Sequence, residues 1–244
     1  MIGTIATNYP DKWRLGLFFI VPMSLFIYLF IRDKNYVDEV FEEGTRQSGK
    51  MSLKFWISWV GFIACIGSEF ATSFWAASLF KDRVGGTAAV ATTIMFAYGI
   101  GMGLGRWYMG QILFNFKLDQ QLLIVIGIQF IGFAIFWFSH IFAVSILGLF
   151  LIGVGLSTQF ALASLRLINL SDGRPDQAIG LSSLAAGIAI ALAPFALGLL
   201  DDAFGISRAY IMVPILIAIA FIVVLAIPAH VSQKKVHEAE GISE

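Results

Sequence analysis

The chain has 244 residues, of which 58% are hydrophobic and 13% are charged, with no net charge and a mean hydropathy of +0.83. Soluble domains carry about 25% charged residues, so this composition indicates a membrane protein. The zero net charge argues against a nucleic-acid-binding surface. The single cysteine, Cys65, excludes a disulfide framework and a thiolate metal cluster.

Apolar runs of about 20 residues are long enough to cross a bilayer as helices. The sequence predicts seven transmembrane helices, at residues 15–31, 55–80, 86–105, 121–139, 141–165, 177–200 and 208–228. Cytoplasmic connections carry an excess of lysine and arginine. Eleven of the 16 such residues lie on the side that holds the long polar 33–54 connection and the C-terminus. We therefore expect both in the cytoplasm, in an inner or plasma membrane.

The 55–80 span contains one side chain that is charged at neutral pH, Glu69. A charge at the bilayer centre costs at least about 2.5–3.5 kcal/mol on insertion scales, and desolvation favours the protonated form of a carboxyl group. On a helix, Glu69 shares a face with Thr72 and Ser73. This polar face predicts a site for a proton or a substrate. A structural hydrogen bond to another helix is the alternative.

Two spans are rich in small residues, which allow helix backbones to approach closely in a membrane. In the 177–200 span, Gly187 and Gly198 predict such a packing face, and Pro194 removes a backbone donor and predicts a bend. In the 86–105 span, the small residues recur at every fourth position: Ala89, Thr93, Ala97, Gly101 and Gly105.

Other polar side chains are predicted at membrane depth. Gln129 in the 121–139 span and Gln159 in the 141–165 span either line a cavity or hydrogen-bond a neighbouring helix. Arg166 lies close enough to the end of its span to extend to the membrane surface. The tryptophans of the 55–80 span either lie at the interface or stack on a substrate: Trp56, Trp59 and Trp75.

Seven spans also occur in receptors and retinal proteins, and intramembrane hydrolases are another alternative. A retinal protein needs a lysine inside its last helix, and the 208–228 span has none. A hydrolase needs paired catalytic side chains at depth, whereas His140 lies in a predicted turn and Asp201 and Asp202 lie at a predicted helix exit. The sequence has no phosphate-binding loop and no metal-ligand spacing, so we expect no enzyme, no cofactor and no metal.

The last six spans form two triplets of similar character. In each triplet a long span with polar residues is followed by a span of small residues and then by a bulky apolar span. Because three is an odd number, the second triplet enters the membrane from the opposite side. Such inverted repeats are typical of secondary transporters.

Two stretches resemble motifs of the major facilitator superfamily of transporters. "GMGLGR" resembles the signature of that family, in which a glycine is followed by three residues, an aspartate or glycine, and an arginine. Gly101, Gly105 and Arg106 fit this pattern, and the usual downstream glycine and basic pair is absent. "AIALAPFALGLLDDAFG", residues 189–205, is similar to the family's penultimate helix.

The resemblance also implies a domain organisation. Residues 33–54 resemble the cytoplasmic loop between the two halves of a twelve-helix member. Residues 1–32 then resemble the last helix of the N-terminal half, residues 55–229 the six-helix C-terminal bundle, and residues 230–244 a cytoplasmic tail.

This organisation implies secondary active transport of a small solute by alternating access. Glu69 resembles an acidic residue that some members carry in helix seven, which implies symport with a proton. The expected partners are membrane lipid, the solute, and either the absent N-terminal half or a second copy of the chain. The alternative is a non-transporting membrane fragment or interaction subunit.

Overall fold

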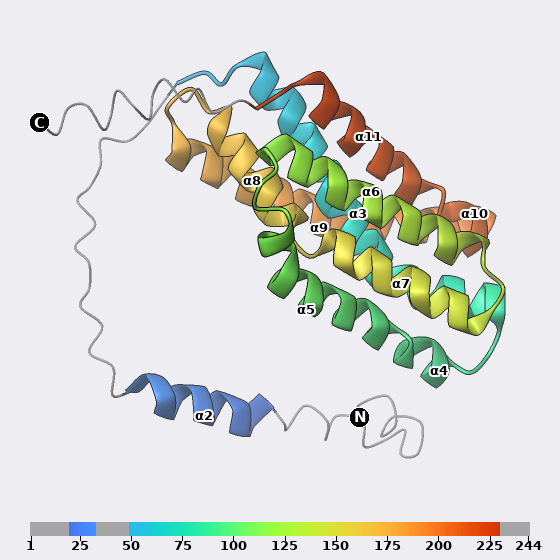
Figure 1. Ribbon diagram of the computed structural model, residues 1–244. Coiled ribbons are helices and arrows are strands. Elements are labelled where there is room, and N and C mark those ends of the chain that lie inside the picture. The colour runs from blue at the N-terminus through green and yellow to red at the C-terminus, as the bar shows by residue number, and fades with distance from the viewer. Residues whose placement is uncertain (1–19, 33–48, 230–244) are drawn as a thin grey trace, which may run out of the picture.

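The computed structural model of the chain describes residues 20–32 and 49–229 (Figure 1). Most of the predicted 33–54 loop and the whole 230–244 tail lie outside the described residues. Regular structure in the described part is helical throughout: α2 (Ile20–Arg32), α3 (Leu53–Val84), α4 (Ala88–Thr93), α5 (Met95–Ile112), α6 (Leu118–Phe138), α7 (Phe142–Leu156), α8 (Gln159–Asn169), α9 (Pro175–Phe204), α10 (Ile206–Ala209) and α11 (Met212–Ala226).

Among the described residues, five helical segments are long and apolar enough to cross a membrane: Leu53–Val84, Leu118–Phe138, Phe142–Asn169, Pro175–Phe204 and Ile206–Ala226. The predicted count of seven spans stays a prediction, because two of the predicted spans do not form one long apolar helix among the described residues. Helix α2 is described over 13 residues. The 86–105 region is divided at Ile94 into α4 and α5, and α5 contains Arg106 among several polar and aromatic residues. The chain is therefore an all-helical, multi-pass membrane protein.

One predicted span boundary differs from the end of the helix. The 86–105 span was expected to end before Arg106, but α5 continues to Ile112, where Leu113 N still donates to Met109 O at 2.9 Å. The residues after Gly105 lower the hydropathy but contain no proline or other helix breaker. Arg106 consequently lies within a helix and not in a connection.

Helices α5, α6 and α7 pack through glycines at very short range. A Cβ added to Gly101 would clash with Phe150 O, and one added to Gly153 would clash with Tyr98 O. On the other side of α7, a Cβ at Gly148 would lie 2.7 Å from Phe136 N. The predicted packing role of the small residues in this region is confirmed for Gly101, whose helix lies directly against α7 (Figure 1).

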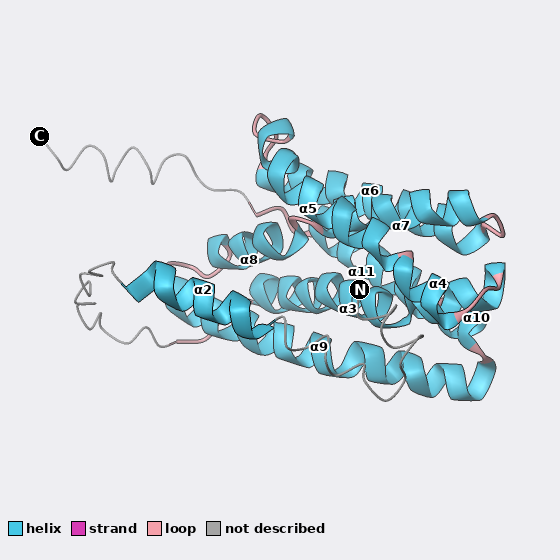
Figure 2. Ribbon diagram, turned by 90° about the horizontal axis from the view of Figure 1, so that it is seen from below, coloured by secondary structure: helices cyan, strands magenta, loops and turns pink. Residues whose placement is uncertain are grey.

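Helix α3 lies centrally, in contact with α8, α9 and α11 (Figure 2). Two of its tryptophans connect it to α9: Trp59 Nε1 donates to Leu181 O at 2.8 Å, and Trp75 Nε1 donates to Pro194 O at 3.0 Å. Each indole N–H is therefore used between helices, while an interfacial or substrate-stacking role of the rings stays a prediction. Helix α9 runs through Pro194 without a break.

Gly198 and Gly187 of α9 occupy different environments. A Cβ at Gly198 would lie 3.0 Å from Cζ2 of Trp75, so this glycine leaves room for the indole ring. Gly187 has no atom within 4 Å of its Cβ position. The described residues therefore give Gly198 a packing role against α3 and leave the surface at Gly187 uncovered.

At one end of the bundle, here called the Arg166 end, three helices are joined by one ion pair. Arg166 is 3% exposed, and its Nε lies 2.9 Å from Oδ1 of Asp119. Its Nη2 donates to the carbonyls of Val223 and Ile227 at the end of α11. Asp119 Oδ2 accepts a hydrogen bond from Ala229 N at 2.8 Å. Arg166 is therefore buried within the protein at this end of the bundle, and its position relative to the membrane surface stays a prediction.

The opposite end, here called the Ser207 end, is held by polar groups that are exposed or half-buried. Ser207 Oγ donates to Asp82 Oδ2 at 2.8 Å and accepts from Arg83 Nε at 3.0 Å. His140 Nδ1 lies 3.2 Å from Arg83 O. The connections thus gather in two groups, as the predicted alternation of spans requires. Which end is cytoplasmic stays a prediction.

Candidate functional site

Glu69 lies in the middle of α3 and is half-buried at the edge of a cavity of about 290 Å³. The cavity is formed by faces of α3, α5, α8 and α9, together with the end of α7. Its lining residues are Ile66, Glu69, Phe70, Arg106, Leu156, Ser157, Phe160, Ala161 and Ile190. A carboxylate and a guanidinium therefore share one cavity whose remaining side chains are mostly apolar.

The two charges are not paired with each other. Among the described residues, the Glu69 carboxylate has no hydrogen bond or ion pair within 4.0 Å. Arg106 is exposed and uses one donor, Nε, to reach Ser157 O at 3.4 Å. The remaining guanidinium N–H groups and both carboxylate oxygens are left for a ligand, water or a partner.

Gly105 explains how Arg106 comes to this position. A Cβ at Gly105 would lie 2.6 Å from Ser157 Cβ and 3.0 Å from Val154 O. Only a residue without a side chain lets α5 approach this closely to the break between α7 and α8 at Ser157 and Thr158. The next residue, Arg106, then lies beside the Ser157 carbonyl.

A second polar cluster is fully buried behind the cavity. Gln129 Nε2 donates to Ser68 Oγ at 2.9 Å, and Gln159 Nε2 donates to Gln129 Oε1 at 2.8 Å. Ser68 Oγ donates in turn to Cys65 O at 2.8 Å. Both glutamines are 1% exposed. Gln159 Oε1 has no hydrogen-bond partner in the described part of the chain. This cluster joins α3, α6 and α8 through neutral groups.

The structure divides the residues that the sequence singled out. Gln129 and Gln159 meet in the buried cluster, while Glu69 and Arg106 line the cavity. Thr72 is fully buried, and its Oγ1 donates to Ser68 O at 2.7 Å within α3. Ser73 Oγ donates to Phe70 O at 3.2 Å. Thr72 and Ser73 therefore use their hydroxyl donors inside their own helix.

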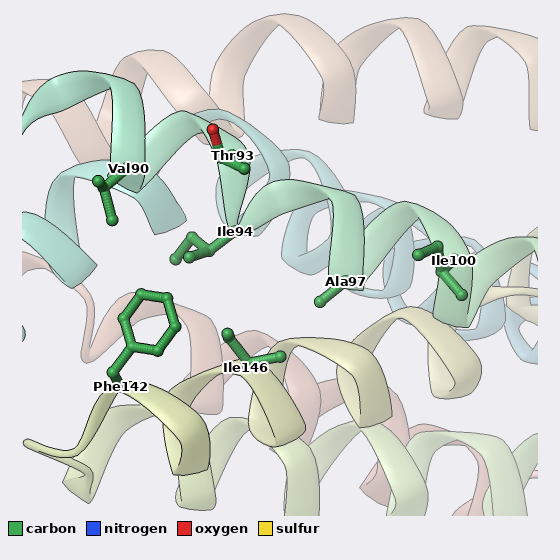
Figure 3. A pocket seen from close by; sticks show the side chains of 7 residues that line it. All are labelled: Val90, Thr93, Ile94, Ala97, Ile100, Phe142 and Ile146. Atoms are coloured by element: carbon green, nitrogen blue, oxygen red, sulfur yellow. The ribbon is translucent and has the colours of Figure 1, made fainter.

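A larger cavity, of about 360 Å³, lies between the α4–α5 segment and the start of α7 (Figure 3). Its lining is apolar apart from one threonine: Val90, Thr93, Ile94, Ala97, Ile100, Phe142 and Ile146. Nothing in this lining carries a charge, so these residues offer no carboxylate or guanidinium such as the smaller cavity has.

The described residues contain no group of three or more histidine, cysteine, aspartate and glutamate side chains that could hold a metal ion. Cys65 is buried and free. The chemistry of the site is therefore that of one carboxylate, one guanidinium and backbone carbonyls between aromatic and aliphatic side chains. Such a site can bind and orient a small solute and can exchange a proton at Glu69.

The sequence alone did not place Arg106 with Glu69. Two signals in the sequence are consistent with its place inside α5: the glycine at position 105, which permits close contact, and the absence of a helix breaker before Lys117.

The bundle is similar to a solved structure, that of the major facilitator superfamily transporter FucP in the outward conformation. The two share 18% sequence identity with a TM-score of 0.61 over 70% of this chain and 42% of that one. The described bundle thus has the fold of part of such a transporter, as the sequence motifs predicted. This chain covers less than half of the length of that transporter. No protein-family model and no curated protein matches the sequence.

Proposed function

We propose that the chain is the solute-binding half of a secondary transporter that couples the movement of a small solute to that of a proton. The observation that carries this proposal is the cavity that Glu69 and Arg106 line without forming an ion pair with each other. Charged groups inside a membrane are costly and mark substrate or ion pathways. The transporter fold of the bundle supports the same function.

The helix contacts support an inverted repeat of three plus three spans. Exchanging the triplet α3, α4–α5, α6 with the triplet α7–α8, α9, α10–α11 relates several of the main helix contacts to one another. The α5–α7 contact corresponds to α9–α3, and the α6–α7 contact corresponds to α11–α3. The α6–α11 contact corresponds to itself. With α2 as an additional span, this arrangement gives the seven transmembrane helices of the proposal.

Glu69 is the proposed proton carrier. In its charged form the carboxylate needs water or a cation nearby, and Arg106 is the only cation in the cavity lining. Protonation removes this need and lets the cavity close around an apolar surface. A carboxyl group in this position can therefore take up a proton from one side and release it when the cavity opens to the other.

A second helical bundle is part of this proposal. The cavity is open, Arg106 is exposed, and the surface of α9 at Gly187 is uncovered. Polar groups facing hydrocarbon without partners cost several kcal/mol each. In this proposal the other half of a transporter, or a second copy of this chain, covers this face. The Arg166 end and the C-terminus lie on the cytoplasmic side of a cell membrane.

The second candidate function is that of a membrane subunit that does not transport. It is favoured by the fact that the chain spans 42% of the similar transporter, because substrate sites of such transporters lie between two repeats or halves. In that role, Glu69 and Arg106 pair with residues of a partner and bind no solute.

The test is solute-driven proton movement in proteoliposomes that contain the purified full chain and a pH-sensitive dye. A panel of sugars, amino acids and organic ions is added outside, and the lumenal pH is recorded. We expect one class of solute to change it. Glu69→Gln should abolish the change with membrane insertion intact, whereas the matched control Asp202→Asn, at an exposed position near the end of α9, should retain it. Solute accumulation by Glu69→Gln with unchanged pH dependence would exclude Glu69 as the proton carrier.

A further inference from the structure

The Glu69 cavity contains two opposite charges that do not satisfy each other. The carboxylate and the guanidinium line the same space of about 290 Å³, yet among the described residues neither forms an ion pair with the other. A ligand with one charge neutralises only one of them and leaves the other uncompensated in a low-dielectric environment. A neutral polyol donates and accepts hydrogen bonds but neutralises neither. A ligand that carries both charges neutralises both.

On the guanidinium side, the geometry suits a carboxylate. The Nε–H of Arg106 is directed to Ser157 O at 3.4 Å, which fixes the plane of the side chain. The two terminal nitrogens remain, and a guanidinium presents these N–H groups as a fork that matches the two oxygens of a carboxylate. The close contact at Gly105 holds this fork in the cavity.

On the carboxylate side, the site offers more than one acceptor for an ammonium group. Glu69 contributes two oxygens without partners in the described chain. Pro194 has no N–H, so the carbonyl of Ile190, four residues earlier in α9, lacks its intrahelical donor. Ile190 lines the same cavity. An ammonium group has three donors and no acceptor, which fits a carboxylate beside a helix residue whose carbonyl receives no hydrogen bond from Pro194.

The rest of the lining is apolar and leaves room for one small side chain. Two aromatic rings and two aliphatic side chains surround the charges: Phe70, Phe160, Ile66 and Leu156. Phe160 is held by an edge-to-face contact with Phe62, with ring centroids 5.7 Å apart. Pockets for drug-sized ligands span roughly 300–1,000 Å³, so about 290 Å³ fits a smaller molecule.

We infer that this cavity binds a small zwitterion with an ammonium group, a carboxylate group and an apolar body, which is the chemistry of an apolar α-amino acid. The carboxylate lies on Arg106, the ammonium group lies between Glu69 and the Ile190 carbonyl, and the apolar body lies against Phe70 and Phe160. This inference rests on the proposed function, whose solute it specifies.

The experiment uses three compounds that share one isobutyl body: L-leucine, L-leucinamide and 4-methylvalerate, with D-glucose as the neutral control. Binding to the purified full chain in lipid nanodiscs is followed as a concentration-dependent rise of the melting temperature. A pH of 6.5 keeps the amine of leucinamide charged, since α-amino groups titrate near 7.7–8.0. We expect leucine to bind about tenfold or more tightly than either singly charged compound, and glucose not to bind.

Two variants make the inference specific to the residues. Arg106→Gln should bring leucine down to the affinity of leucinamide, because the carboxylate then has no cation. Glu69→Gln should bring leucine down to the affinity of 4-methylvalerate. Gly103→Ala, one turn from Arg106 with open space around its Cβ position, is the matched control and should bind leucine like the unchanged chain. Equal binding of glucose and leucine, no binding of leucine, or an unchanged preference in both variants would overturn the inference.

Its failure is distinguishable from failure of the proposed function. If a sugar or an organic ion moves protons in the proteoliposome assay and leucine neither binds nor moves them, the chain transports but the zwitterion assignment is wrong. If leucine binds with the expected dependence on Glu69 and Arg106 and no solute moves protons, the site is correct and the chain does not transport without a further bundle.

Discussion

Arg166 Nε lies 2.9 Å from Asp119 Oδ1, and this ion pair connects α8 to α6 at one end of the bundle. The same two residues also reach the end of α11, Arg166 through the carbonyls of Val223 and Ile227 and Asp119 through Ala229 N. The pair is nearly buried, with side chains 3% and 16% exposed. One pair of opposite charges therefore connects three helices.

Removing one member of this pair should be strongly destabilising. Asp119→Asn leaves a buried guanidinium without a counter-charge, which costs about 3–5 kcal/mol of unfolding free energy. Denaturant unfolding in mixed micelles measures the loss. The double variant Asp119→Asn with Arg166→Gln should cost less than the sum of the single variants. Asp202→Asn, at an exposed position, should stay within about 0.5 kcal/mol. Additive losses in the double variant would show that the two side chains act independently.

The glycines of α5 provide a matched pair for a second prediction. Gly101→Ala places a methyl group against Phe150 O of α7, whereas Gly103→Ala places it in open space. Overpacking costs about 1–3 kcal/mol, and an alanine in an exposed helix position gains about 0.5–1 kcal/mol over glycine. We expect Gly101→Ala to lower the melting temperature of the purified protein and Gly103→Ala to leave it unchanged or raise it. Equal effects of the two would mean that α5 does not pack on α7 as described.

The sequence was sufficient to predict the helices, because length and hydropathy dominate in a membrane, where every backbone group must be satisfied within the segment. It was also sufficient to predict close packing at Gly101. It did not identify α7 as the packing partner, since a small-residue face specifies short distance and not which helix lies opposite.

The site was harder to predict, because its groups come from separate helices. Gln129 and Gln159 are 30 residues apart in sequence and 2.8 Å apart in space. The residue type of each glutamine was compatible with an interhelical hydrogen bond or with a place in a cavity lining. Only the arrangement of the helices shows that the two side chains form the hydrogen bond. The predicted span ended at Gly105 because hydropathy falls after that residue. Hydropathy does not report where helical hydrogen bonding ends, and α5 continues to Ile112.

The buried glutamine pair leads to a third prediction. Gln129→Leu removes the acceptor of Gln159 Nε2 and the donor to Ser68 Oγ, and so leaves polar groups buried without partners. Each such group costs about 1–3 kcal/mol. The double variant Gln129→Leu with Gln159→Leu removes both amides and should be more stable than the sum of the single losses predicts. Unfolding free energies of the three variants in mixed micelles test this. A double variant as unstable as that sum would argue against a direct bond between the two amides.

The last prediction concerns orientation and follows from the lysine and arginine distribution. In a chain whose buried cysteine is replaced by Cys65→Ala, single cysteines at Asn115 or Asp172 lie in connections of the Arg166 end, and cysteines at His140 or Phe204 lie near the Ser207 end. We expect a membrane-impermeant thiol reagent added to intact cells to label the second pair and not the first, and to label the first pair after the membrane is opened. The arginine-rich end is expected inside because positive charges are retained in the cytoplasm. Labelling of the first pair in intact cells would mean that the topology is inverted. Labelling of one member of each pair would mean that the spans do not alternate, and the three-plus-three arrangement depends on that alternation.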